Sequence, residues 1–174
     1  MNTRSEALAR RIELGAKTLA AYAERLTDAE WNTIARPDRR KIGVIIHHVA
    51  SVYPIEIQLA HQVAAGQAIE EVSWDVIASM NAIHARENTN VGKFETIHLL
   101  QRNSRAAADA VRALTDEQLD RCAPVSLNAG APLTTQYIIE DHALRHSWHH
   151  LAKIKAALKS IRPTLRGPML VSAL

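Results

Sequence analysis

Residues 141–150 read Asp-His-Ala-Leu-Arg-His-Ser-Trp-His-His and lie inside one long helical pattern. Three of these histidines, His142, His146 and His150, are spaced four residues apart. Because an α-helix turns by ~100° per residue, each step of four rotates a side chain by only about 40°. The three imidazoles therefore share one face, and two imidazoles at positions i and i+4 can bind the same metal ion. We expect the chemistry of the chain to lie on this helix.

The rest of the chain is also patterned as helix. Aromatic residues make up only 4% of the sequence and alanine is abundant, which favours helices over sheets. Apolar residues recur at helical spacing in four long segments, at about 5–26, 39–65, 91–114 and from Thr134 or Thr135 to Ser160. A short helix is expected to begin near Ser73, in the connection between the second and third segments. The pattern predicts an all-α fold, a four-helix bundle with a long crossover containing a short helix.

Prolines and glycines mark the expected breaks. Gly66 is a plausible stop for the second helix, and Pro54 lies inside that helix. No strand-like alternation occurs, and residues 124–132 are expected to form a loop. Residues 161–174 contain two Pro-containing breaks and are expected to form an irregular tail. The length of 174 residues suits a single domain, 1–174.

Composition narrows the range of partners. The single Cys122 fits a reducing compartment, and neither a signal peptide nor an apolar run of ~18 residues is evident. We therefore expect a cytoplasmic protein without a membrane partner. The net charge is +3, and its basic residues are scattered except at 36–41. We interpret that cluster as a solvated turn rather than an anion or nucleic-acid site, because it has no interleaved aromatic residues.

A metal site on the fourth helix needs a further ligand from a facing helix. The second helix offers His47 and His48. The apolar residues that lie within about 60° of His48 on that helix are Val44, Ile45, Val52, Ile55, Leu59 and Val63. His48 therefore belongs to the core face, whereas His47 points to solvent or to a helix neighbour. Glu56 lies at the edge of the same face. We expect it either to accept a hydrogen bond from a metal-binding histidine or to bind the metal through a water molecule.

The alternative interpretation is a hydrogen-bonded histidine cluster without a metal. Three histidines on one face with a fourth opposite favour the metal, because each buried imidazole needs a partner. The angles alone do not exclude His142 as a ligand. His61, His84 and His98 are interpreted as isolated residues without a role in the site.

The sequence resembles the DinB/YfiT-like family along most of its length. The resemblance rests on Ile-Ile-His-His-Val-Ala at 45–50, His-Ser-Trp-His-His-Leu-Ala-Lys-Ile at 146–154 and Leu-Thr-Asp-Glu-Gln-Leu-Asp at 114–120. Members of this family are metal-binding four-helix bundles and often dimers. Their ligands are a histidine of the second helix and an H-x-x-x-H pair of the fourth, which by motif are His48, His146 and His150 here.

The resemblance implies an enzyme that uses one divalent metal ion, with zinc or nickel favoured and iron or copper also compatible. Some members resemble transferases or isomerases that use a low-molecular-weight thiol, so we expect thiol transfer or hydrolysis on a small molecule. His142, Glu56 and Lys153 are the candidate catalytic or substrate-contacting residues. The alternative is a non-catalytic dimer in which the metal is structural or sensory.

One position departs from the family pattern. Many members carry glutamine three residues after the last histidine, where this chain has Lys153. A lysine there can repel the metal, lower its own pKa, bind an anionic substrate or extend into solvent. A homodimer is also expected, because Leu144 and Leu151 are apolar residues opposite the histidines.

Overall fold

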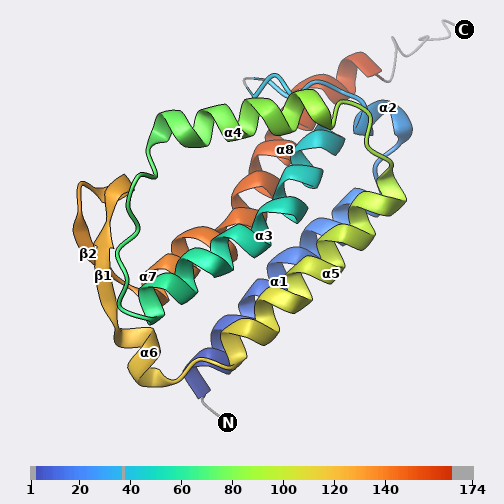
Figure 1. Cartoon of the computed structure of the whole chain (residues 1–174). Helices are drawn as coiled ribbons and strands as arrows, with labels where there is room; N and C mark the ends of the chain where they lie inside the picture. Colours follow the sequence, from blue (N-terminus) through green and yellow to red (C-terminus); the bar gives the residue numbers. More distant parts are fainter. Residues whose placement is uncertain (1–2, 37, 166–174) are drawn as a thin grey trace, which may run out of the picture.

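The computed structural model describes residues 3–36 and 38–165, and for residues 161–165 it describes the backbone alone. Four long helical stretches form the bundle (Figure 1). They are α1 (Thr3–Glu24), α3 (Ile42–Ala64), α5 (Lys93–Arg112) and the final stretch of α7 (Thr135–Ile139), a π-helical turn (Glu140–Leu144) and α8 (Arg145–Leu165). The predicted all-α four-helix bundle is confirmed.

The bundle encloses one hydrophobic core. Helix α5 packs against both α1 and α3, and α3 packs against α7 and α8. Large apolar side chains that are almost fully buried come from every long helix, including Ile12, Ile45, Leu100 and Ile154. The small residues between them let the helices approach closely. The site described below lies where α3 faces α8.

The connections contain three further α-helices, α2, α4 and α6. Both α2 (Asp28–Trp31) and α6 (Asp116–Asp120) begin with a capping box, from Thr27 and Thr115 respectively. The crossover helix α4 (Trp74–Glu87) begins after Ser73 as expected, but it is 14 residues long rather than short. It runs across the end of α3 and α8 in Figure 1.

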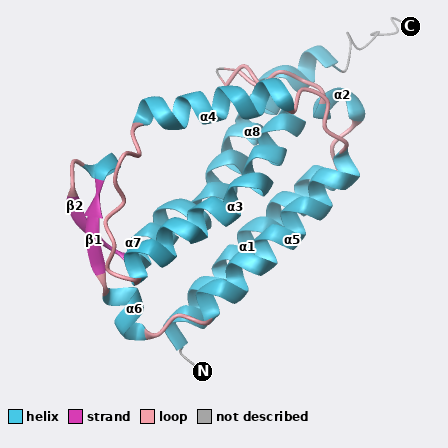
Figure 2. Ribbon diagram, in the orientation of Figure 1, coloured by secondary structure: helices cyan, strands magenta, loops and turns pink. Residues whose placement is uncertain are grey.

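A β-hairpin replaces the loop predicted at 124–132. Strands β1 (Cys122–Val125) and β2 (Ala131–Thr134) pair antiparallel, with Pro124 opposite Pro132 (Figure 2). A short 3₁₀ turn, Ser126–Asn128, connects them. Ile69 of the crossover pairs with β1 through two hydrogen bonds. Its N–H donates to the Pro124 carbonyl, and its carbonyl accepts from the Ser126 N–H, at 2.9 Å each. The alternation of apolar and polar residues along a strand cannot predict this support from a distant segment.

The helix boundaries follow the sequence with some shifts. Thr134 is the N-cap of α7, and Gly66 follows the end of α3 with φ +76°. Helix α3 begins at Ile42 rather than near 39, because Arg39 adopts a positive φ of 64°. Helix α8 continues to Leu165, so the prediction of an irregular tail is wrong for residues 161–165. The remainder of that tail lies outside the described residues.

Helix α3 has an apolar character that the sequence analysis did not anticipate. By length and composition, Ile42–Ala64 is apolar enough to cross a membrane, but 56% of its most apolar window is buried inside the bundle. A central helix of a bundle needs apolar residues on most of its surface. We attribute the hydropathy of α3 to this position.

The two leucines chosen for a dimer interface lie in the core of the chain itself. Leu144 and Leu151 are 9% and 2% exposed. They cannot form the interface proposed from the sequence. The homodimer itself stays a prediction.

Candidate metal centre

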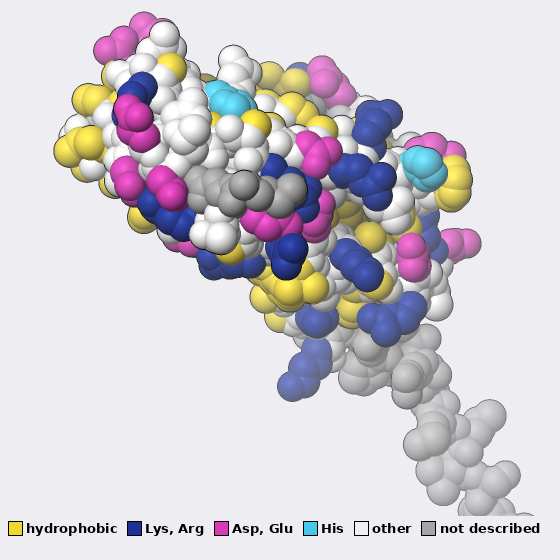
Figure 3. Space-filling model, turned by 90° about the horizontal axis from the view of Figure 1, so that it is seen from below, with side chains coloured by type: hydrophobic (Ala, Val, Ile, Leu, Met, Phe, Trp, Pro, Cys, Tyr) yellow, Lys and Arg dark blue, Asp and Glu magenta, His cyan; other side chains and the backbone are white. Residues whose placement is uncertain are grey.

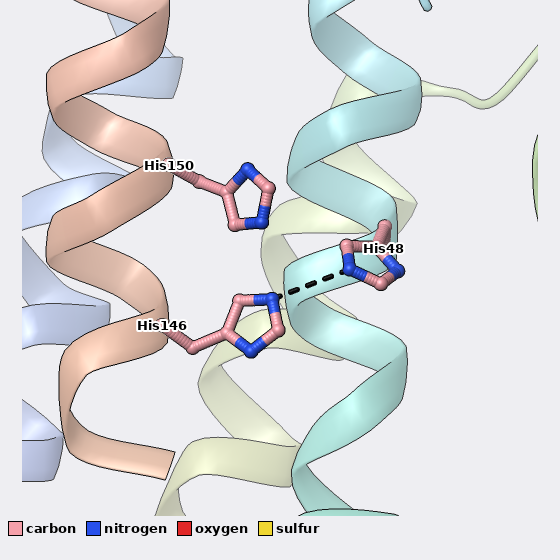
Figure 4. Close-up of side chains that lie close together, drawn as sticks. All are labelled: His48, His146 and His150. Carbon is pink, nitrogen blue, oxygen red and sulfur yellow. Dashed lines mark hydrogen bonds between the residues drawn. The ribbon is translucent and has the colours of Figure 1, made fainter. Parts of the chain in front are cut away.

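Three histidines from two helices converge between α3 and α8 (Figure 4). His48 projects from α3, and His146 and His150 project from α8 one turn apart. Their potential ligand atoms all lie within 4.8 Å of one another. The Nε2 atoms of His48 and His146 are 3.2 Å apart. Two nitrogen ligands of a tetrahedral zinc ion stand about 3.3 Å apart, since each Zn–N bond is ~2.0–2.1 Å, so this pair has the separation that a metal requires.

Glu56 fixes the orientation of His146. Its Oε1 atom lies 2.5 Å from Nδ1 of His146, and the glutamate side chain is 7% exposed. The carboxylate accepts a hydrogen bond from Nδ1–H, which leaves the lone pair of His146 on Nε2, the atom that faces His48. This carboxylate–histidine arrangement is common behind metal-binding imidazoles. Glu56 therefore acts as the acceptor that the sequence analysis allowed.

A buried hydrogen bond holds the two helices at the level of the site. The Tyr53 hydroxyl of α3 and the Ser147 hydroxyl of α8 are 2.7 Å apart, and both side chains are almost completely buried. Burial raises the pKa of Tyr53 well above its usual value, so the phenol stays protonated. Since Ser147 follows His146 directly, this bond also limits sliding of α8 along α3.

The site favours neutral imidazoles. His48 and His150 are 6% and 7% exposed. Burial, followed by the charges of neighbouring histidines and of Arg40, lowers the pKa of each to about 2. A metal ligand must be an unprotonated imidazole. The donor set of three neutral imidazoles, one supported by a carboxylate, therefore fits a divalent ion of the zinc type.

His142 and Lys153 lie apart from the three converging nitrogens. Within residues 3–36 and 38–165, the group of potential metal ligands consists of His48, His146 and His150 without His142. The π-helical turn Glu140–Leu144 explains this result, because its wider turn rotates His142 relative to the α-helical positions that follow. Lys153 is exposed, and its charge contributes to lowering the pKa of His149.

The crossover helix adds a residue that the sequence analysis treated as isolated. Nε2 of His84 on α4 lies 2.9 Å from Nδ1 of His47, and the His84 ring contacts the edge of His48 at a centroid distance of 5.5 Å. Burial, His47 and Arg40 lower the pKa of His84 to about 4. His47 thus points away from the triad, toward α4 and its helix neighbour Ser51. No helical spacing within α4 could have revealed this contact.

The fold and the histidines together define a class of protein, four-helix bundles with a three-imidazole centre between the second and fourth long helices. The chain belongs to the DinB superfamily, whose family model matches residues 11–154.

Among solved structures, the fold is similar to that of YfiT from Bacillus subtilis, with a TM-score of 0.73 and 16% sequence identity over 93% of this chain and 90% of that chain. YfiT is described as a probable metal-dependent hydrolase with an unusual four-helix bundle topology. The sequence matches none of the curated proteins with which it was compared.

Proposed function

We propose that this protein is a metal-dependent hydrolase of a small molecule, with one divalent ion held by His48, His146 and His150. The observation that carries the proposal is the 3.2 Å approach of two Nε2 atoms, one of which Glu56 orients through the opposite ring nitrogen. The hydrolase description of YfiT agrees with this assignment. Zinc and nickel are the ions that we favour for a site of imidazoles.

Three protein ligands are typical of catalytic rather than structural zinc sites, because they leave a position for water or substrate. When bound there, the ion would polarise a substrate oxygen and lower the pKa of a water molecule. The residues of this chain have separate tasks. His48 and His150 offer neutral imidazoles, and Glu56 keeps His146 in the required tautomer.

Glu56 supports a ligand from behind its ring. Oε1 contacts Nδ1 of His146, the ring nitrogen opposite the Nε2 atom that faces His48. Oε2 is buried and has no hydrogen-bond partner among the described residues. We therefore assign Glu56 the task of orienting His146, and its contact with that histidine supports this assignment.

The test compares zinc-loaded and nickel-loaded protein with the His146→Ala/His150→Ala variant on a panel of esters, amides and lactones. We expect hydrolysis by the loaded wild type and by His149→Ala, whose histidine is exposed on the same helix, but not by the double variant.

The same panel should include electrophiles offered together with glutathione, mycothiol or bacillithiol. Thiol transfer without hydrolysis would contradict the hydrolase assignment in favour of a transferase. Metal binding without either reaction would indicate a structural or sensory ion.

A further inference from the structure

The crossover between α3 and α5 is fixed to the rest of the chain on both sides of α4. Before α4, the Ser126 hydroxyl donates to the Val72 carbonyl at 2.7 Å. After α4, the Trp31 indole N–H donates to the Val91 carbonyl at 3.0 Å. Figure 1 shows long connections leading from α4 in both directions. Helix α4 therefore lies between two anchored points of the crossover.

Helix α4 itself has little packing to hold it in place. None of its 14 residues is buried, whereas α5, the next helix, buries seven of its 20. Among the α-helices of the described residues, α4 is the one that buries no residue. A helix of this length is marginal without packing, and a segment with few buried contacts opens at a low cost in free energy. We therefore expect α4 to separate from the bundle more readily than the long helices do.

One side-chain hydrogen bond joins α4 to the bundle. Nε2 of His84 on α4 and Nδ1 of His47 on α3 are 2.9 Å apart, and the two rings stack with their centroids 5.1 Å apart. Within residues 3–36 and 38–165, no other side-chain hydrogen bond connects α4 to another helix. His47 directly precedes the proposed ligand His48. The attachment of α4 is thus located beside the metal centre.

His84 also contacts the metal centre directly. Its ring meets the ring of His48 edge-on, with centroids 5.5 Å apart and an angle of 69° between the ring planes. His48 is 6% exposed in this arrangement. The hydrogen bond to His47 and the cover over the edge of His48 are therefore provided by the same side chain. Withdrawal of His84 would uncover one edge of a proposed metal ligand.

We propose that α4 is a lid over the metal centre, held closed by the hydrogen bond between His47 and His84. This inference rests on the proposed function, because it concerns access to the ion held by the triad. Opening of α4 gives the ion a route to solvent, as the opening of a lid does in many enzymes. His84 is a positioning residue and not a ligand. Loss of its hydrogen bond changes the rates at which the metal enters and leaves, and leaves the equilibrium affinity largely unchanged.

Hydrogen exchange of the metal-free protein, followed by mass spectrometry, tests whether α4 opens. In wild type, the amides of 74–87 should exchange faster than those of α3 and α5. His84→Ala and His47→Ala break the same hydrogen bond from opposite sides, and each should accelerate the exchange of α4 roughly 2–10-fold. The double variant should exchange no faster than either single variant. His61→Ala, the same change at an exposed position of α3, is the matched control and should exchange as wild type does.

Release of bound zinc to an excess of a chromogenic chelator tests whether this opening controls the metal. Release should accelerate roughly 2–10-fold in His84→Ala and His47→Ala, with one ion per chain before the chelator is added. His61→Ala should release zinc at the wild-type rate. Unchanged release in both latch variants would overturn the lid, because α4 would then not control access to the ion. A lower affinity in His84→Ala but not in His47→Ala would overturn it in favour of His84 as a direct ligand.

Failure of the proposed function would look different. Wild type that retains no zinc would contradict the metal centre itself, and hydrogen exchange would then decide the role of the hydrogen bond alone. Faster exchange of α4 in both single variants would support a movable α4. Exchange equal to that of wild type would overturn it.

Discussion

Two arginines of this chain sit in contrasting surroundings. Arg112 links α5 to α1, and its three guanidinium nitrogens each bind a carboxylate, from Glu6, Glu13 and Asp109, at 2.8 to 2.9 Å. Arg40 binds one carboxylate and keeps a buried donor that has no partner among the described residues. The first arrangement is complete in the isolated chain, as expected of a structural ion network. The second is incomplete, and native proteins rarely leave a buried donor in that state.

Side chains of opposite charge also lie close together elsewhere at the surface. On the face shown in Figure 3, Lys and Arg side chains lie next to Asp and Glu side chains, which compensate one another at the surface. The triad region instead gathers the buried neutral imidazoles of His48 and His150 between α3 and α8. A region that contributes mainly to stability satisfies its own polar atoms. A region that binds a ligand leaves some of them for the ligand.

In metal-free protein, acid should lower the free energy of unfolding through the triad histidines and not through the Arg112 network, and this is the largest difference that we expect between the two regions. His48 and His150 have a pKa of about 2 in the folded chain, but an unfolded chain protonates histidine near 6.5. The unfolded state therefore binds more protons below pH ~6.5, and the free energy of unfolding falls by about 1.4 kcal/mol per pH unit for each of the two histidines. Urea titrations at pH 7, 6 and 5 measure this slope.

The Arg112 network should not respond in that pH range. Hydrogen bonds from Arg10 and then Arg112 lower the pKa of Glu6, so its contribution to stability is lost only as the pH falls below 4.5 and through the folded value. The control is His48→Gln/His150→Gln, whose stability should depend less on pH between 7 and 5. An unchanged slope in that variant would show that the acid response arises elsewhere.

The same substitution should act differently on the two glutamates. Glu56→Gln removes the carboxylate that supports His146, and metal affinity should fall roughly 10–100-fold. Glu13→Gln removes a carboxylate partner of Arg112 and should leave metal affinity unchanged. Competition with a chromogenic chelator measures both. Equal affinities of Glu56→Gln and wild type would mean that the 2.5 Å contact does not contribute to metal binding.

The smallest effect on stability is expected from Arg112→Gln. Arg112→Gln breaks ion pairs whose carboxylate side chains are 21% to 64% exposed, and such pairs in contact with solvent contribute little to stability. The melting temperature should fall by roughly 2–4 °C or less, with no change in metal content. Calorimetry of the metal-free variant is the measurement. A much larger decrease would mean that the network is essential for packing α1 against α5.

Helical spacing predicts the directions of side chains where the helices are regular. His146 and His150 both follow the π-helical turn, so their relation of one turn could be read directly from the sequence. His142 lies within that turn, so a uniform angle per residue does not describe its direction relative to His146. Ile55 also failed the angular assignment, since it is 42% exposed. Helix α3 is apolar on most of its surface, which blurs the direction of its core face.

The residues that sequence reasoning missed depend on long-range packing. His84 reaches the site because α4 packs against α3. Arg40 is largely buried because the preceding loop folds back on Ala35 and Asp38 binds its guanidinium. The hairpin at 122–134 needs its contact with Ile69. Local patterns do not encode these arrangements, even though each long helix of the bundle was predicted.

Elemental analysis of protein purified without a histidine tag tests the central claim most directly. The account predicts one divalent ion per chain in wild type, the same content in His47→Ala, and none in His146→Ala/His150→Ala. His47 is the matched control because it neighbours His48 but binds His84 instead of facing the triad. One ion per chain in the double variant would contradict the account, since the metal would then be bound outside the three imidazoles.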